Sequence, residues 1–351
     1  CLASTSNNLN LIISLFSVSA LISRPFAGKL ADNVGRKSTM YVGTIICVVI
    51  TFIYPLSGSV SFFLLLRFMH GFSSGFLPTG ATALITDILP PERRGQGMGV
   101  FGTGISLGIG VGQFLGTPLN QWLTLDGLFF ASGILAMVSI LMVKSVKETL
   151  EEPKPFSWKM FRLKKDEFFE VKVLPVAIVM FLTASCSGIL FVLSPDLSTY
   201  LGIENKGWFF MFYVISTIAV RLSIGKLSDK IGRRKAMIIG MVFLIISMLM
   251  VAFAKDVFAY TSASIVFGVA TGINSPTLFA WMADLSPSHR RGIGSGTLFI
   301  SLELGILFGS ASTLFIYDST YESAFLVFIY GAFLALLAML FLIWHLTRRL
   351  V

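Results

Sequence analysis

Three ionisable residues inside apolar stretches are the first candidates for chemistry. Arg67 lies within the run Val60–Ile88, and His70 follows it one turn later on the same face of a helix. Glu303 lies deep in a second apolar run. A charged side chain at the centre of a bilayer costs about 2.5–3.5 kcal/mol even on the lenient insertion scale, so such residues face a cavity or a partner. Glu303 could therefore carry a proton, bind a cationic substrate or pair with Arg67.

Each of these residues also has a purely structural explanation. Arg67 could extend its guanidinium to the membrane edge, although several residues separate it from the nearest outer loop. His70 has the residue type that titrates near neutral pH, but a single His in a helix is more often a hydrogen-bonded packing residue. The elements that carry these side chains decide between the two explanations.

The composition predicts that these elements are membrane-spanning helices. Hydrophobic residues make up 55% of the 351 residues and charged residues only 13%, whereas a soluble domain keeps about a quarter of its residues charged. A helix that crosses the hydrocarbon core needs roughly 20 apolar residues, and the chain contains many such runs. We therefore expect an all-α polytopic membrane protein.

Apolar runs and their charged breaks predict eleven helices and one polar linker. A charge-rich linker covers residues 144–170 and contains an amphipathic piece, Ser157–Phe169, that could lie along the membrane surface. The predicted helices are Leu11–Gly28, Thr39–Leu56, Val60–Ile88, Glu92–Thr117, Leu123–Val143, Val171–Leu193, Lys206–Gly225, Ala236–Phe253, Val257–Asp284, Arg290–Tyr317 and Ser323–Leu346.

Two separated motifs show that the chain is an internal duplication. The basic, glycine-containing stretch Gly28–Lys37 recurs as Gly225–Arg234, and each copy is expected to be a tight turn between two helices. The stretch Asp87–Gly99, with its pattern D-x-x-P-x-x-R-R-G-x-G-x-G, recurs as Asp284–Gly296. Both pairs have the same offset of 197 residues, which relates the two halves position by position.

These repeated motifs resemble the signature of the major facilitator superfamily of transporters. The resemblance covers nearly the whole chain, and it implies twelve helices in two pseudo-symmetric six-helix bundles. The first helix after the linker then has its counterpart before Cys1, so we expect that this chain lacks the first transmembrane helix and is inactive without it. We expect an N-terminal bundle at residues 1–143, the linker at 144–170 and a C-terminal bundle at 171–351.

The repeated loops carry the first predicted site. Asp32 and Asp229 lie where a helix has just ended, so their carboxylates can accept hydrogen bonds from the N-terminus of a neighbouring helix. The resemblance implies that these motifs form a cytoplasmic latch that breaks when the bundles rock; the alternative is that the charges only cap helices and anchor the topology. The predicted latch residues are Gly28, Asp32, Gly35, Arg36, Asp87, Arg93, Gly225, Asp229, Gly232, Arg233, Asp284 and Arg290.

A second resemblance concerns the coupling residues. The pattern Leu64-x-x-Arg67-x-x-His70-Gly71 is similar to an element in the fourth helix of the family, with His where Gln is usual. The resemblance implies that Arg67 takes part in substrate binding and proton transfer. We therefore group Arg67, His70 and Glu303 as the predicted coupling site.

A substrate cavity is predicted where helices are interrupted. Asn274 and Pro276 are expected to break one helix, as Pro78 does another, and broken helices often line substrate sites because their freed backbone groups need a polar cavity. Tyr213 and Trp281 could supply aromatic walls. Asn274, Tyr213 and Trp281 are the predicted cavity residues.

The distribution of the basic residues indicates the membrane topology. The chain has 27 Lys and Arg residues against 18 Asp and Glu, and most of the basic residues fall in alternate loops, the linker and the C-terminal tail. This asymmetry places the repeated loops, the linker and the C-terminus in the cytoplasm of a cell (inner) membrane. We expect no nucleic-acid partner. The three Cys and three His residues are scattered, so we expect no disulfide, metal site or cofactor.

The direction of transport is the least determined point. Family antiporters carry G-x-x-x-G-P-x-x-G-G in the fifth helix, and the matching stretch here is Gly108-x-x-x-Gly112-Gln113-x-x-Gly116-Thr117. This partial match favours proton-coupled efflux of small molecules by a monomer in the lipid bilayer, with protons as the second partner. A proton symporter that imports a sugar or organic acid is the alternative. A membrane enzyme or receptor comes third, because it would need a catalytic constellation or an added domain.

Overall fold

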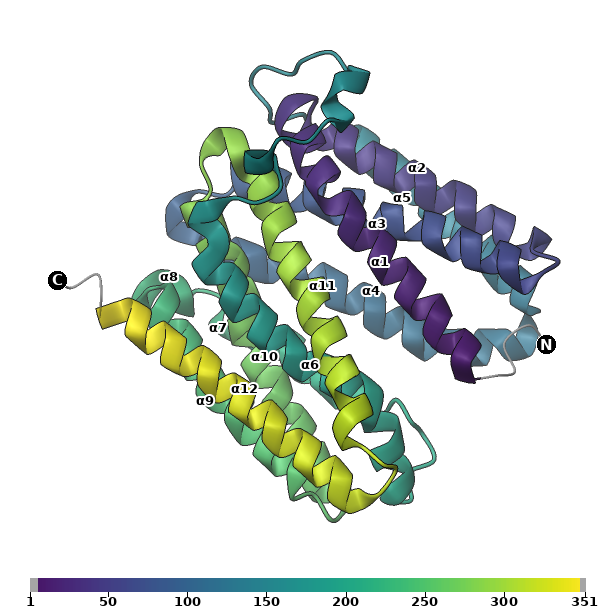
Figure 1. Cartoon of the computed structure of the whole chain (residues 1–351), viewed down its shortest axis with the longest axis vertical. Helices are drawn as coiled ribbons and strands as arrows, with labels where there is room; N and C mark the ends of the chain where they lie inside the picture. The colour runs from purple at the N-terminus through teal and green to yellow at the C-terminus, as the bar shows by residue number, and fades with distance from the viewer. Residues whose placement is uncertain (1–5, 348–351) are drawn as a thin grey trace. The chain divides into compact units, whose positions relative to one another are not determined.

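The structure, a computed structural model, is built of helices (Figure 1). It describes the backbone of residues 6–347 and the side chains of residues 15–112, 115, 119, 122–158, 160, 162–165 and 167–346. Within this part of the chain no strand is present. The helices are α1 (Ser6–Asn33), α2 (Arg36–Ile53), α3 (Val60–Ile88), α4 (Arg94–Trp122), α5 (Leu125–Ser145), α6 (Leu174–Tyr200), α7 (Trp208–Ile224), α8 (Leu227–Ile231), α9 (Arg233–Ala252), α10 (Val257–Leu285), α11 (Arg291–Ile316) and α12 (Tyr321–Thr347).

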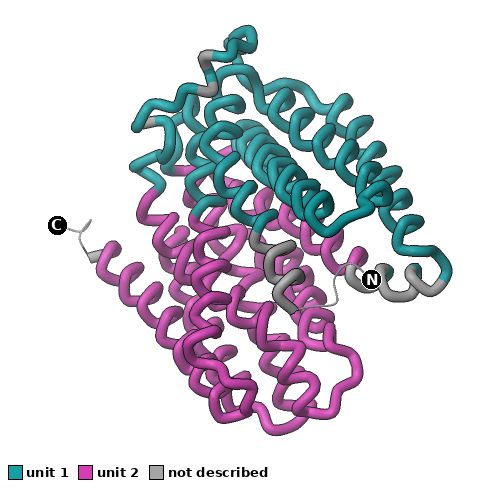
Figure 2. The backbone as a smooth tube through the Cα atoms, turned by 45° about the vertical axis from the view of Figure 1, so that its right-hand side comes forward, with its two compact units in different colours: residues 1–88, 114–173, 285–300 teal, residues 89–113, 174–284, 301–351 magenta. Residues whose placement is uncertain are grey.

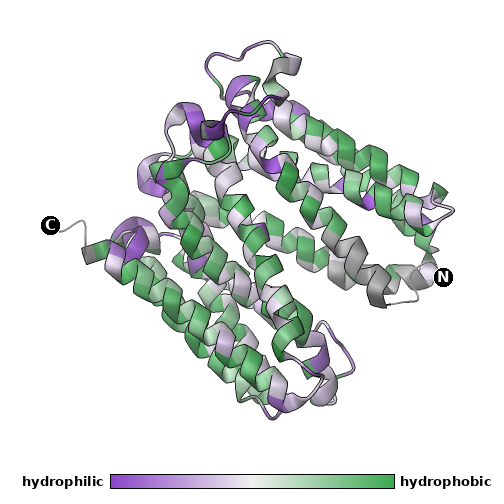
Figure 3. Ribbon diagram, in the orientation of Figure 1, coloured by the Kyte–Doolittle hydropathy of each residue, from purple (hydrophilic) through white to green (hydrophobic). Residues whose placement is uncertain are grey.

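The long helices agree with the prediction of a polytopic membrane protein. Among the described residues, eight helices are long and apolar enough to cross a membrane. Figure 3 shows hydrophobic residues along the helices and hydrophilic residues gathered at helix ends and in the linker. Every predicted helix has a counterpart, and the prediction for α3 has the observed bounds. The five-residue helix α8 was not predicted.

Two local predictions were wrong. Proline does not break α3 or α10, because both helices run on through Pro78 and Pro276. After each proline a threonine hydroxyl donates back to the carbonyl four residues earlier, from Thr79 to Gly75 at 2.7 Å and from Thr277 to Ile273 at 2.6 Å. Side-chain bonds of this kind help membrane helices to accommodate proline.

The repeated turns are also shorter than predicted. Residues 28–33 continue α1, so the first turn is confined to Val34 and Gly35. In the second copy α7 ends at Ile224, and α8 resumes two residues later. The piece predicted to be amphipathic, Ser157–Phe169, has short 3₁₀ turns at Trp158–Phe161 and Lys165–Glu167, and a third turn, Val171–Val173, follows the linker.

The chain forms two compact units (Figure 2). Unit 1 contains residues 1–88, 114–173 and 285–300, and unit 2 contains residues 89–113, 174–284 and 301–351. The first part of α4 therefore belongs to unit 2 and the first part of α11 to unit 1, although a division of the chain at the linker would place them the other way round. The predicted bundles, with boundaries at residues 143 and 171, stay a prediction.

Each unit has its own helix packing. In unit 1, α3 packs against α1 and α2, and α2 packs against α5 around Ile50, Tyr54 and Leu66. In unit 2, α12 packs against α6 and α9. Gly188 and Gly305 let α6 and α11 approach closely, because a Cβ at either glycine would collide with backbone atoms of the other helix.

Candidate functional site

In unit 1 the Asp32 carboxylate lies against the first turn of α11. Its Oδ1 accepts from the Gly292 N–H at 2.7 Å, and its Oδ2 accepts from the Ile293 N–H at 2.8 Å. These are among the donors that a helix leaves unpaired at its N-terminus, where the helix dipole also favours negative charge. The structure therefore has the contact that the position of Asp32 in the sequence predicted.

Arg36, at the start of α2, joins this carboxylate to a second one. Its guanidinium donates to Asp32 Oδ1 at 2.8 Å and to Asp87 Oδ2 at 3.1 Å. It also donates to the carbonyls of Ala31 and Ser288. Arg36 is only 1% exposed, so nearly the whole charge is held by these partners. Arg291, the first residue of α11, donates to Asp87 Oδ1 at 2.6 Å. We call Asp32, Arg36, Asp87, Arg291 and the two N–H groups the first cap cluster.

Glycine is required at two positions of the first cap cluster. Gly35 has φ of 143°, in the region that side chains avoid. Gly28 lies where α1 crosses α11, and a Cβ there would come within 2.9 Å of the Gly292 oxygen. The predicted importance of these glycines thus has a steric basis.

The linker encloses the first cap cluster. Glu148 accepts from the Arg36 and Lys37 N–H groups, each at 3.0 Å, and thereby caps α2. Thr149 donates to Asp87 Oδ2 at 2.6 Å. Nearby, Lys29 pairs with Glu167 at 2.7 Å. Sequence reasoning missed all of these linker contacts.

Unit 2 contains the repeat of this arrangement. Asp229 accepts from the Gly95 and Gln96 N–H groups, both at 2.9 Å, at the start of α4. Arg233 joins Asp229 to Asp284, with a distance of 2.8 Å to Asp284. Arg94 also donates to Asp284 at 2.8 Å. We call Asp229, Arg233, Asp284, Arg94 and the two N–H groups the second cap cluster.

Glycines also shape the backbone near the second cap cluster. Gly232 has φ of 90°, the counterpart of the positive φ at Gly35. Gly225 falls in the two-residue break between α7 and α8, where its register partner Gly28 is helical.

Two predicted latch arginines lie elsewhere. Arg93 is exposed, and Arg290 pairs with Glu170 of the linker. Each ends a 3₁₀ turn, and the arginine that follows it is the first to belong to the helix and reach the carboxylate. The second arginine of each Arg-Arg pair thus belongs to a cap cluster: Arg291 to the first and Arg94 to the second. The sequence signal was the doublet itself, which does not say where the helix begins.

The protonation of Asp32 is set by its burial. Asp32 lies beyond the expected membrane span that ends at Gly28, and its side chain is 4% exposed. Burial raises the pKa of the Asp32 carboxyl from 3.8 to about 6, although Arg36 and the N–H groups of Ile293 and Gly292 favour the charged form. Asp32 therefore changes charge within the range of pH values that cells generate.

Arg67 and His70 belong to an aromatic cluster in unit 1. The Arg67 guanidinium lies 4.9 Å from the centre of the Phe16 ring, which is cation–π distance. His70 Nδ1 lies 3.0 Å from the Tyr54 hydroxyl. The sequence analysis did not single out Tyr54. This residue is 3% exposed and begins the 3₁₀ turn that follows α2. Glu303 is half-buried in α11 and belongs to unit 2, so its proposed pairing with Arg67 stays a prediction.

The three predicted cavity residues lie in helix contacts of unit 2. Asn274 is 4% exposed and packs so closely on Gly240 of α9 that a Cβ there would collide with it. The Tyr213 ring packs on Phe267 at 5.2 Å between centroids. Trp281 lies edge-on to His345 at 5.8 Å, and Arg234 lies over its ring. Their role in a substrate cavity stays a prediction.

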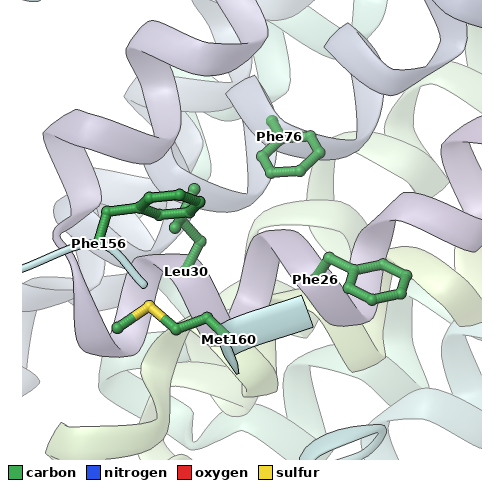
Figure 4. Close-up of a pocket in the computed structure, with 5 residues that line it drawn as sticks. All are labelled: Phe26, Leu30, Phe76, Phe156 and Met160. Carbon is green, nitrogen blue, oxygen red and sulfur yellow. The ribbon is translucent and has the colours of Figure 1, made fainter. Parts of the chain in front are cut away.

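A hollow of about 240 Å³ lies in unit 1 beside the linker (Figure 4). Phe26 and Leu30 of α1 and Phe76 of α3 line one side, and Phe156 and Met160 of the linker line the other. The lining is apolar, so this hollow shows where the linker packs on the helices.

Comparison with known proteins agrees with this arrangement. The family model described as Major Facilitator Superfamily matches residues 2–204 and 176–349. Multidrug resistance protein 2 of Bacillus subtilis is 24% identical over 92% of this chain and 83% of its own length. The multi-drug resistance efflux pump PmrA of Streptococcus pneumoniae is 26% identical over 79% of this chain and 71% of its own length.

Among solved structures, the human organic anion transporter MFSD10 has a similar fold. The TM-score is 0.82 at 20% identity, over 95% of this chain and 83% of that chain. Fold and family together define a membrane transporter. The chain belongs to the major facilitator superfamily.

Proposed function

We propose that this transporter exports small molecules in exchange for protons, and that it works by alternating access. The observation that carries the proposal is the repeated cap cluster, in which a carboxylate from one helix holds the N-terminus of another. Two such contacts, one from each repeat, suit a protein whose cytoplasmic side closes and opens in every cycle.

The helices joined by each cluster belong to different predicted bundles. The first cap cluster joins α1 to α11, and the second joins α8 to α4. Opening toward the cytoplasm would pull α11 away from Asp32 and α4 away from Asp229. The clusters would then act as a latch whose hydrogen bonds form on the inside and break as the bundles rock.

Proton coupling is assigned to Arg67, His70 and Glu303. Tyr54 joins this group because its hydroxyl contacts the His70 ring. A hydrogen-bonded Tyr–His pair inside a membrane protein can accept a proton and pass it on. The neighbouring arginine can bind a negatively charged group of the substrate. Export, and the class of small drug-like substrates, is supported by the similarity to the Bacillus and Streptococcus proteins named above.

Everted membrane vesicles that contain the twelve-helix form, with the expected first helix added to the chain, provide the test. A proton gradient is imposed and followed with a pH-sensitive dye while lipophilic cations, drugs, sugars and organic acids are added in turn. We expect some drugs to dissipate the gradient, and we expect Arg67→Ala and Glu303→Gln to abolish that response. If no compound dissipates it and right-side-out vesicles instead accumulate a sugar or organic acid with protons, the protein is an importer.

Lys255→Gln is the matched control, because Lys255 is an exposed residue of an outer loop. This variant removes a positive charge from an exposed loop of unit 2 that is not part of the proposed coupling group. Its response should equal that of the wild-type protein, so a loss in Arg67→Ala cannot be ascribed to the change in net charge alone.

A further inference from the structure

Arg221 is a buried cation that lacks an acidic partner. It lies in the last turn of α7 and is 7% exposed. Its Nη1 donates to the Ser106 hydroxyl of α4 at 2.8 Å, and its Nη2 donates to the Ser275 hydroxyl of α10 at 3.2 Å. Among the described residues no carboxylate forms an ion pair with Arg221, and its buried Nε–H has no acceptor.

This arrangement is costly for the protein. A guanidinium stays charged under all ordinary conditions, and a buried charge without a counter-ion is unfavourable by several kcal/mol. Arg36 and Arg94 are buried to a similar degree, and each donates to a carboxylate. Arg221 therefore differs from the buried arginines of the two cap clusters.

The guanidinium of Arg221 packs on α4 at a position that has no side chain. Gly102 of α4 faces the guanidinium, and a Cβ there would lie 3.0 Å from Nη1. At Gly99, one turn earlier, a Cβ would be 3.8 Å from the Arg221 oxygen, whereas at its register partner Gly296 it would be 3.1 Å from the Arg24 oxygen. The crossing of α4 and α7 is thus looser than its repeat in unit 1.

The side of α7 next to Arg221 is also hollow. A space of about 220 Å³ lies between α7, α8 and α10, lined by Val220, Ile224, Gly225 and Pro276 among others. Two of its lining residues, Val220 and Pro276, are the chain neighbours of Arg221 and Ser275.

The two repeats differ in charge at the position of Ser106. Ser106 is the register partner of Glu303, and Arg221 is the register partner of Arg24. One repeat thus supplies a carboxylate where the other has only a hydroxyl. The hydroxyls of Ser106 and Ser275 can rotate to donate hydrogen bonds. Together with Arg221 they therefore present only hydrogen-bond donors to an anion.

We propose that Arg221, Ser106 and Ser275 form a binding site for the carboxylate of a small organic anion. The unpaired Nε–H and an Nη2–H make the edge of the fork that receives both oxygens of a carboxylate. The bound carboxylate would supply the negative charge that Ser106 lacks and that its register partner Glu303 has. This site depends neither on the direction of transport nor on proton coupling.

The test measures thermal unfolding of the purified 351-residue chain in nanodiscs of phosphatidylcholine, followed by tryptophan fluorescence. Sodium acetate and sodium benzoate are titrated against sodium chloride at equal ionic strength, with benzyl alcohol as the uncharged analogue of benzoate. A ligand that binds only the folded state raises the Tm with its concentration. We expect a saturable rise of several degrees with the carboxylates, little with chloride and none with benzyl alcohol.

Three variants make the test specific. Arg221→Gln should abolish the rise, and Lys255→Gln should keep it. Ser106→Glu should abolish it while raising the Tm without ligand, because the protein then supplies its own carboxylate beside Arg221. Ser106→Glu also keeps the test decisive if Arg221→Gln fails to fold.

Several outcomes would overturn the proposal. They are the absence of any rise with acetate and benzoate, an equal rise with chloride, and a rise that persists in Arg221→Gln or in Ser106→Glu. Because no transport is measured, failure of the efflux proposal would leave this result unaffected.

Discussion

The two cap clusters have the same bonds but different surroundings. In both, an aspartate accepts from two N–H groups at the start of a helix, and an arginine joins that aspartate to a second one. In the first cap cluster Arg36 is 1% exposed, whereas in the second Arg233 has a side chain that is 12% exposed. Asp87 and Asp284 differ in the same direction, at 11% and 30%.

The linker accounts for this difference. Glu148 and Thr149 of the linker contact the first cap cluster, whereas the segment that contacts Arg234, next to the second cluster, is the end of α12 at the His345 carbonyl. The supporting helix differs too, because α1 is continuous and α7 gives way to α8. The first cap cluster is thus the more buried of the two. We expect the hydrogen bonds of the second cap cluster to break more readily.

The largest expected effect comes from removing the central arginine of each cluster. Arg36→Ala would leave Asp32 and Asp87 buried with fewer donors, so we expect the free energy of unfolding to fall by about 3–5 kcal/mol. Arg233→Ala should cost less, about 2 kcal/mol, because water can reach Asp284 even though Asp229 is left buried. Chemical unfolding in detergent micelles, followed by tryptophan fluorescence, measures both.

Lys37→Ala is the control for this pair, since Lys37 neighbours Arg36 but donates to the Lys144 carbonyl at the surface. Its loss should be less than about 1 kcal/mol. Equal losses for Arg36→Ala and Arg233→Ala would remove the proposed difference between the clusters.

The pH dependence of stability sharpens the comparison further. The pKa of Asp32 is about 6 in the folded protein and about 3.8 when hydrated, so the folded state binds this proton more readily. The contribution of Asp32 is therefore fully present below about pH 4 and is lost as the pH rises to about 6, by at most about 3 kcal/mol. Unfolding of the wild-type protein and of Asp32→Asn between pH 4.5 and 7.5 tests this.

The informative quantity is the difference between the two curves, because other groups titrate in both proteins. The stability of the wild-type protein relative to Asp32→Asn should decline as the pH rises through this window. Parallel curves would mean that Asp32 keeps the same pKa in the folded and unfolded states.

The sequence predicted the shared part of the clusters better than their difference. The offset of 197 residues and the position of Asp32 were enough to predict that each carboxylate would meet a helix N-terminus. The choice of Arg291 over Arg290 was not predictable, because it depends on whether the helix begins one residue earlier or later. The contacts of Glu148 were missed for another reason: no repeat marks them, and they depend on how the linker folds back on α2.

At the prolines, the sequence predicted a feature that the structure does not have. Pro78 and Pro276 suggested broken helices and a polar cavity, but α3 and α10 run on through them. Whether a helix breaks at proline depends on its neighbours and on packing, and a single sequence shows only the proline itself.

A matched pair of glycines tests the difference in helix packing. In Gly296→Ala the new Cβ would lie 3.1 Å from the Arg24 oxygen of the backbone, and in Gly99→Ala it would lie 3.8 Å from the Arg221 oxygen. The gain in helix propensity is the same for both, up to about 1 kcal/mol. We therefore expect Gly296→Ala to be less stable than Gly99→Ala by about 1–2 kcal/mol, measured by the same unfolding assay. The reverse order would mean that α4 crosses α7 as tightly as α1 crosses α11.

The smallest effect concerns the linker itself. Glu148→Gln keeps the shape of the side chain but removes the charge that caps α2, so we expect a loss of about 1 kcal/mol. Hydrogen exchange followed by mass spectrometry locates the effect. The amides of Arg36 and Lys37 should exchange faster, because they donate to Glu148, while those of Arg233 and Arg234 should not change. Faster exchange at both sites would show that Glu148 stabilises both clusters alike, and the linker would then not explain the difference between them.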